Sequence, residues 1–224
     1  MNIGMIVGIG PAATDYYYRA IIRKMAEAGQ DLNMMMAHAD TPTLLRNQST
    51  NNVQSQLDIY MRLTERLMKA GVEAVAVTSI AGHFCIDEFA ASSPIPVIDM
   101  IDCIKQEISN QKLKRVGLLG TRVVMETGFY SKLNSVDVVA PETEQLNAVH
   151  EAYITMAAAG TVTEQQIEVF QSAGKALVEK QNCESIILAG TDLALVYTDD
   201  FDAGFCILDC AKLHAHEIVK WAQR

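Results

Sequence analysis

The stretch EAVAVTSIAGHF, residues 73–84, decides the fold of this chain. It starts as a run of small apolar residues typical of a buried strand, and then breaks into hydroxyl side chains, a glycine and His83. In α/β proteins, ligands bind at the carboxyl ends of parallel strands. The stretch therefore predicts a parallel strand that ends at a binding site.

A second stretch of the same kind, ESIILAGTDLAL, spans residues 184–195. Three strand-to-loop junctions recur in the same order at offsets of 110 to 113 residues: NIGMIVG with RVGLLGT, EAVAVTS with ESIILAG, and PVIDM with CILDC. A helical apolar pattern precedes each middle strand, over residues 53–70 and 164–180. Three matches in register indicate an internal duplication.

Alternating strands and helices imply parallel sheets. We predict an α/β fold of two similar doubly wound parallel-sheet lobes related by internal duplication, with a ligand cleft between them. The expected boundaries are 1–100 for the first lobe, 101–209 for the second, and 210–224 for a C-terminal helix that packs back on the first lobe. Residues 41–52, rich in Ser, Thr and Asn, are expected to form a loop.

The composition limits the partners of this chain. A formal charge of −9 and a pI near 5.0 argue against nucleic acid or an anionic membrane. The sequence has no apolar run of 18 residues and no basic N-terminal region typical of a signal peptide. Five cysteines without CxxC spacing look like reduced thiols. We expect a cytoplasmic protein.

A glycine turn, GIGPAAT at residues 8–14, precedes the first predicted helix. Pro11 lies inside the turn and no acidic residue follows at the usual distance, so a dinucleotide site is disfavoured. The alternatives are that the free N–H groups of Gly8 to Thr14 bind a carboxylate or that the segment only turns the chain. Gly120, Thr121 and Arg122 permit the same interpretation in the second half. Arg122 would otherwise form a surface or inter-lobe ion pair.

Several ionisable side chains follow predicted strands. His83 is a base, a donor or a hydrogen-bonded structural residue. His38 and Asp40 end the second strand, but no compact ligand motif supports a metal there. Arg46 is the candidate for binding a substrate carboxylate, with a solvated arginine as the alternative.

The chain resembles the aspartate/glutamate racemase superfamily over nearly its full length. The resemblance rests on the ordered set GIGPAAT, TSIAGH, LLGTR, AGTD and LDCAKLHA. It implies a cofactor-independent enzyme, usually a homodimer, in which two cysteine thiols flank the substrate Cα. In that family the middle strand typically ends in Cys-Asn-Thr-x-His in the first lobe and in Gly-Cys-Thr-Glu in the second. At the Cys-Asn-Thr positions this sequence carries Ser79, Ile80 and Ala81. At the Cys-Thr-Glu positions it carries Gly190, Thr191 and Asp192. Both thiols are replaced.

We therefore expect a racemase-like isomerase, without cofactor or metal, that acts on a small carboxylate or amino acid through a modified acid/base site. The alternatives are a decarboxylase or lyase in the same cleft, or an inactive carboxylate-binding protein. Gly190 is expected to leave room for a bulkier substituent, and Cys85 to point away from Ser79. The expected catalytic residues are Ser79, His83, Thr191 and Asp192. The expected substrate-binding residues are Gly8, Gly10, Thr14, Asp40, Arg46, Thr78, Ile80, Ala81, Gly120, Thr121, Arg122 and Gly190.

Overall fold

The structure, a computed structural model, describes residues 1–8, 11–198 and 200–224. The chain divides into two compact units: residues 1–100 together with 211–224, and residues 101–210. None of the described helices is long and apolar enough to cross a membrane.

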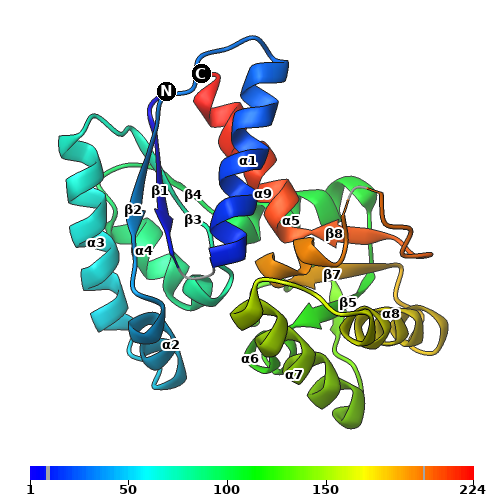
Figure 1. The fold of residues 1–224 in the computed structure, drawn as a ribbon. Coiled ribbons are helices and arrows are strands. Elements are labelled where there is room, and N and C mark those ends of the chain that lie inside the picture. Colours follow the sequence, from blue (N-terminus) through cyan, green and yellow to red (C-terminus); the bar gives the residue numbers. More distant parts are fainter. Residues whose placement is uncertain (9–10, 199) are drawn as a thin grey trace. The chain divides into compact units, whose positions relative to one another are not determined.

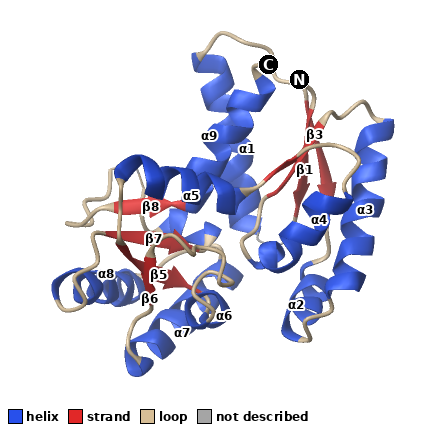
Figure 2. Ribbon diagram, turned by 180° about the vertical axis from the view of Figure 1, so that it is seen from behind, coloured by secondary structure: helices blue, strands red, loops and turns tan. Residues whose placement is uncertain are grey.

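The first unit is built on a four-stranded parallel sheet of order β2-β1-β3-β4. Helices α1 and α9 lie side by side on one side of this sheet, and α3 and α4 lie on the other (Figures 1 and 2). Its elements are β1 Ile3–Val7, α1 Pro11–Glu27, β2 Met34–His38, α2 Thr41–Ser49, α3 Val53–Lys69, β3 Ala74–Val77, the 3₁₀ helix η1 Ala81–Cys85, α4 Ile86–Ser92, β4 Val97–Ile98 and the C-terminal α9 Cys210–Ala222.

The second unit has a four-stranded parallel sheet of order β6-β5-β7-β8. Helix α8 contacts β5 and β7, whereas α6 and α7 contact β5. Its elements are α5 Met100–Gln111, β5 Arg115–Gly120, α6 Arg122–Glu126, β6 Asp137–Val139, α7 Thr143–Ala159, α8 Glu164–Glu179, β7 Ser185–Ala189, the 3₁₀ helix η2 Thr191–Leu195 and β8 Ile207–Asp209. The two strand orders correspond one to one, which confirms the prediction of two similar parallel α/β sheets.

The repeated glycines and glutamates have matching roles in the two units. A Cβ on Gly4 would lie 2.7 Å from Val72 Cγ1, so glycine lets the first strand pack closely. Gly117 is crowded in the same way by α8 and β7. Oε2 of Glu73 accepts a hydrogen bond from the backbone N–H of Asn2, and Oε2 of Glu184 accepts two from residues 114 and 115. Each glutamate thus ties the start of a middle strand to the start of its neighbour.

The prediction of a loop over residues 41–52 is wrong, because α2 occupies most of that segment. Asp40 is the N-cap of α2, and its side chain accepts hydrogen bonds from the backbone N–H and the hydroxyl of Thr43. Pro42 stands in the first turn, where its missing N–H costs nothing. β4 covers only Val97–Ile98, since Pro94 and Pro96 just before it cannot donate to a ladder.

Candidate functional site at the strand ends

In each sheet the strand order reverses at one point, the topological switch point. It lies between β1 and β3 in the first sheet and between β5 and β7 in the second. From β1 the chain crosses to β2 on one side and then to β3 on the other, and β5, β6 and β7 repeat this path. In doubly wound sheets the crevice at the carboxyl ends of such strands is the binding site. In the first unit those ends carry Gly8 and Thr78–Ser79, and in the second Thr121 and Gly190.

Gly8 has a φ of +99°, and a Cβ there would lie 2.2 Å from Nδ1 of His38. Its N–H donates to Oγ1 of Thr14, 3.1 Å away, and its carbonyl accepts from the hydroxyl of Thr41. The Gly8 N–H is therefore engaged within the turn. The expected contact at Gly10 lies outside the described residues.

Ser79 is the hydroxyl residue that ends the middle strand of the first unit. The residue is 6% exposed, and its hydroxyl has no hydrogen-bond partner among the described residues. The neighbouring Thr78 differs, because its hydroxyl donates to the carbonyl of Ile6. Ser79 is thus the hydroxyl that this strand end leaves available to a ligand.

The backbone around Ser79 is held by side chains from several elements. Gln48 donates to the carbonyl of Ala81, and the Tyr60 hydroxyl donates to the carbonyl of Gly82. Ile80 is buried at the N-cap of η1. Cys85 is fully buried, with its Sγ 3.9 Å from the carbonyl oxygen of Gly82.

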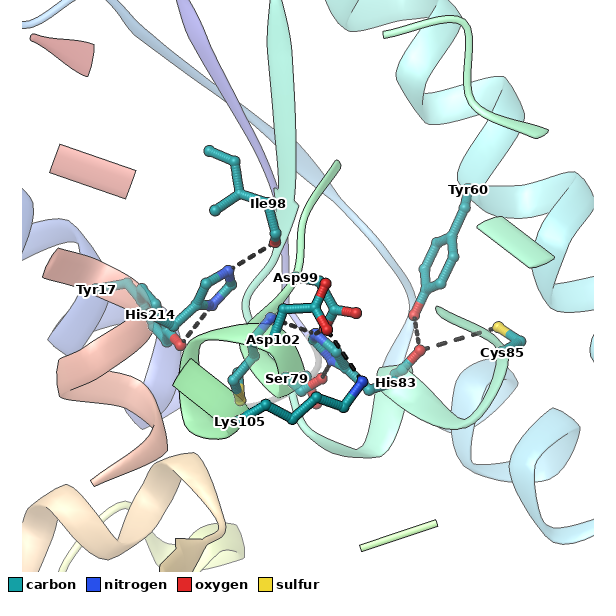
Figure 3. A network of polar contacts seen from close by, with 12 residues as sticks. Tyr17, Tyr60, Ser79, His83, Cys85, Ile98, Asp99, Asp102, Lys105 and His214 are labelled. Atoms are coloured by element: carbon teal, nitrogen blue, oxygen red, sulfur yellow. Dashed lines mark hydrogen bonds and ion pairs between the residues drawn. The ribbon is translucent and has the colours of Figure 1, made fainter. Parts of the chain in front are cut away.

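His83 is fully buried, and its ring positions the Ser79 segment (Figure 3). Nδ1 lies 2.7 Å from the Ser79 carbonyl oxygen, which only accepts, so Nδ1 carries the proton. Nε2 accepts from the N–H of Met100 at 3.4 Å and lies 3.6 Å from Oδ1 of Asp99. The imidazole therefore contacts the backbone of Ser79, with Asp99 on its other side.

A second buried histidine, His214 on α9, joins three elements of the first unit (Figure 3). Its Nε2 donates to the carbonyl of Ile98 at 2.8 Å, so its Nδ1 accepts from the Tyr17 hydroxyl at 3.0 Å. Burial, followed by the nearby His83, lowers the pKa of His214 to about 3. The ring is therefore neutral and structural.

Among the described residues, no hydrogen bond or ion pair joins Asp40 or Arg46 to Ser79. Asp40 caps α2, and its hydrogen bonds to Thr43 hold the pKa of this carboxyl below its usual value. Arg46 lies exposed on α2, without an ion pair among the described residues.

At the second strand end, Gly120 allows β5 and β7 to approach each other. A Cβ on Gly120 would lie 2.3 Å from the carbonyl oxygen of Ala189. Thr121 is the N-cap of α6 without a side-chain capping bond. Arg122 donates to Oδ1 of Asn147 at 2.7 Å and lies 3.6 Å from Glu126. Arg122 therefore forms an ion pair within its own unit.

Thr191 and Asp192 begin η2 and are both buried. Oδ2 of Asp192 accepts a hydrogen bond from the Tyr153 hydroxyl at 2.9 Å. The prediction that Gly190 leaves extra room is wrong, since a Cβ there would lie 2.3 Å from Cε2 of Tyr153. The ring of Tyr153 on α7 occupies the space beside Gly190.

Helix α7 supplies strand-end groups that were not among the predicted site residues. Asn147 holds Arg122, His150 Nδ1 accepts from the backbone N–H of Arg122, and Tyr153 holds Asp192. These three residues are spaced by three along the helix, so they share one face. This spacing of three polar residues could have indicated that the helix faces the strand ends, but it matches none of the motifs considered in the sequence.

Other features of the described residues add no second site. A surface groove of about 850 Å³ between α7 and α8 is lined by residues such as Glu142, Glu168 and Lys175, and by none of the strand-end residues above. Among the described residues, no group of three or more His, Cys, Asp or Glu side chains could hold a metal ion.

Comparison with known proteins gives one family. The model of the Asp/Glu/Hydantoin racemase family matches residues 6–218. A candidate Asp/Glu racemase from Yersinia pestis is 25% identical, with a TM-score of 0.87 and full coverage of both chains. An aspartate racemase homologue from Pyrococcus horikoshii OT3 is 23% identical over 100% of this chain and 99% of that one, with a TM-score of 0.82. Glutamate racemase from Francisella tularensis, solved with D-glutamate, shares the fold at 14% identity and a TM-score of 0.69, over 98% and 80% of the chains.

Proposed function

Because the chain belongs to the Asp/Glu/Hydantoin racemase family, we propose that it is a cofactor-independent isomerase that acts at the Cα of a small amino acid or related carboxylate. In this proposal one ligand contacts the strand ends of both units. Gly8 and Thr78–Ala81 border it from the first unit, and Gly120–Arg122 and Gly190–Thr191 from the second.

The observation that carries the proposal is the Ser79 hydroxyl. It stands at the switch point of its sheet without a partner among the described residues, whereas the backbone around it is fixed by Gln48, Tyr60 and His83. Donors held in place before the reaction stabilise developing negative charge without reorganisation. Ser79 is therefore suited to donate a hydrogen bond to the carboxylate of a ligand whose Cα loses a proton.

The roles of His83 and Asp192 change in light of their burial. His83 is proposed as a positioning residue for Ser79, because its ring contacts the Ser79 carbonyl and not the hydroxyl. Asp99, next to His83 and with a side chain 13% exposed, is proposed as the ionisable group that exchanges the proton. Asp192 is proposed to hold the end of the middle strand in the second unit, where its carboxylate accepts a hydrogen bond from the Tyr153 hydroxyl.

A one-sided decarboxylation or elimination is the second candidate, and Gly190 favours it. Glycine supplies no acid or base at the position that Ser79 occupies in the first unit. A reaction of this kind needs fewer opposed proton-transfer groups than racemisation.

Proton exchange in D₂O tests the proposed function. The wild type is incubated with both enantiomers of aspartate and glutamate, and with related dicarboxylates, while the Cα proton is followed by NMR. Racemisation exchanges this proton, whereas a decarboxylase or lyase consumes the compound. We expect Ser79→Ala to slow the reaction by roughly 100-fold, the usual effect of removing one such donor. The matched control is Ser49→Ala, on the exposed end of α2.

Two results would contradict the proposal. If no compound exchanges or disappears, although some stabilise the protein thermally, the chain is a binding protein. If Ser79→Ala reacts as fast as the wild type, the chemistry lies elsewhere. A homodimer, proposed from the resemblance, is tested separately by light scattering.

A further inference from the structure

Gly190 occupies the position in the second unit that corresponds to Ser79 in the first. Both follow the middle strand of their sheet, at the offset of 111 residues that also relates Glu73 to Glu184. η2 begins directly after Gly190, and η1 begins two residues after Ser79. In the first unit the side chain at this position is the hydroxyl of Ser79, two residues after β3. The second unit has no side chain at this point.

The ring of Tyr153 fills that side-chain space from α7. A Cβ built on Gly190 would lie 2.3 Å from Cε2, 2.7 Å from Cζ and 2.8 Å from the hydroxyl oxygen of Tyr153. The hydroxyl therefore stands close to where a side chain of residue 190 would begin. Glycine is required because the ring takes its space.

The Tyr153 hydroxyl is held by the first residues of η2. It donates to Oδ2 of Asp192 at 2.9 Å. Burial, followed by the Asp192 carboxylate, raises the pKa of Tyr153 well above its usual range, while hydrogen bonds from the Asp192 backbone and the Thr191 side chain act in the opposite direction. The phenol is thus a neutral donor to a buried carboxylate.

We propose that Tyr153 is a positioning residue of the second strand end: its ring covers Gly190, and its hydroxyl fixes Asp192 and hence the Gly190–Asp192 segment that borders the ligand. This inference rests on the proposed function for the ligand, but the geometry concerns the second unit alone. Each unit then places one hydroxyl at the end of its middle strand, Ser79 from the segment that follows β3 and Tyr153 from helix α7.

The test uses Tyr153→Phe, which keeps the ring and removes the hydroxyl. Its matched control is Tyr197→Phe, since Tyr197 is buried in the same unit and its hydroxyl has no partner among the described residues. We expect Tyr153→Phe to speed amide hydrogen exchange at Leu193 and Val196, whose N–H groups close η2, by about 10- to 100-fold. In Tyr153→Phe, exchange at the His83 amide in η1 should stay unchanged. In the control variant, exchange at Leu193 and Val196 should also stay unchanged.

Kinetics on whichever compound the wild type turns over separate positioning from mere stability. We expect Tyr153→Phe to lower kcat/KM by about 10- to 100-fold and to lower kcat more than it raises KM, because Asp192 loses the donor that fixes its segment. The Tyr153→Phe/Asp192→Ala double variant should lose no more than the worse single variant, since each change removes the same contact.

Failure of the inference and failure of the proposed function look different. A wild type inactive on every compound defeats the proposed function, and amide exchange then decides the inference alone. Folded Tyr153→Phe with the same exchange rates as Tyr197→Phe would overturn the inference. So would a normal kcat/KM or a loss confined to KM in an active protein, or losses that multiply in the double variant.

Discussion

Single residues explain why the two strand ends are chemically different. Ser79 has its hydroxyl available, whereas Gly190 gives its space to Tyr153. The sequence located both positions, because the internal offsets align them. It did not reveal Tyr153, because the ring comes from α7, far along the chain, and only the folded packing brings it over Gly190.

Gly190→Ala is predicted to destabilise the protein. The added methyl would meet the Tyr153 ring at 2.3 Å, and the ring is buried and tied to Asp192, so it cannot move freely. Overpacking of this kind costs about 1–3 kcal/mol of unfolding free energy. Urea denaturation measures it. In the control, Tyr153→Ala combined with Gly190→Ala should cost less than the sum of the single changes. Equal stability of Gly190→Ala and the wild type would show that the ring is not fixed.

His214 is predicted to make stability depend on pH. Its pKa of about 3 in the folded protein lies below the ordinary value of 6.5. Between these values the unfolded chain binds a proton that the folded chain does not. The contribution is therefore complete above about pH 6.5 and is lost as the pH falls toward 3, by on the order of a few kcal/mol.

Urea denaturation at pH 7, 6, 5 and 4 measures this dependence. His214→Gln keeps a donor and an acceptor but does not titrate, so its stability should fall less steeply over this range. Parallel curves for the two proteins would mean that other groups cause the acid sensitivity.

At the scale of elements, regular apolar strands were predictable and short polar helices were not. β1, β3, β5 and β7 are nearly fully buried, so their apolar runs identified them. Helix α2 was missed because TPTLLRNQS has few apolar residues and depends on its cap at Asp40. The carboxylate of Asp40, which the sequence suggested for ligand binding, instead accepts the hydrogen bonds of this cap.

Asp40→Ala is predicted to destabilise α2, and Asp40→Asn is predicted to be nearly neutral. Losing the cap leaves N–H groups of the first turn without an acceptor, whereas Asn caps helices as well as Asp does. Thermal unfolding of both variants, with Asp58→Ala on α3 as the control, gives the comparison. If Asp40→Asn instead abolishes ligand binding at unchanged stability, the carboxylate serves the ligand and not the helix.

At the scale of the whole molecule, the first unit is discontinuous and the second is continuous. The last helix joins the first unit through the bond from the N-terminus to the Ala222 carbonyl and through the contacts of His214 with Tyr17 and Ile98. In the sequence the repeat ends near residue 209, so residues 210–224 lie outside the duplicated part. We propose that the units are folding domains, with α9 a required part of the first.

Fragments test this division. Residues 101–210 contain a whole sheet and should unfold cooperatively on their own, as followed by circular dichroism. Residues 1–100 should be less stable, and a peptide of residues 211–224 should raise their melting temperature with increasing concentration. A His214→Ala peptide is the control. No response to the wild-type peptide, or loss of folding in 101–210, would contradict the proposed domains.

The central proposal is that one small ligand contacts the strand ends of both units. Backbone amide shifts of the ¹⁵N-labelled protein, titrated with the amino acid that exchanges its Cα proton, test it most directly. We predict that the amides of Gly8 and Ser79–Ala81, together with those of Thr121, Gly190 and Thr191, shift with a single dissociation constant. Shifts confined to one unit, or centred on the groove between α7 and α8, would contradict the claim.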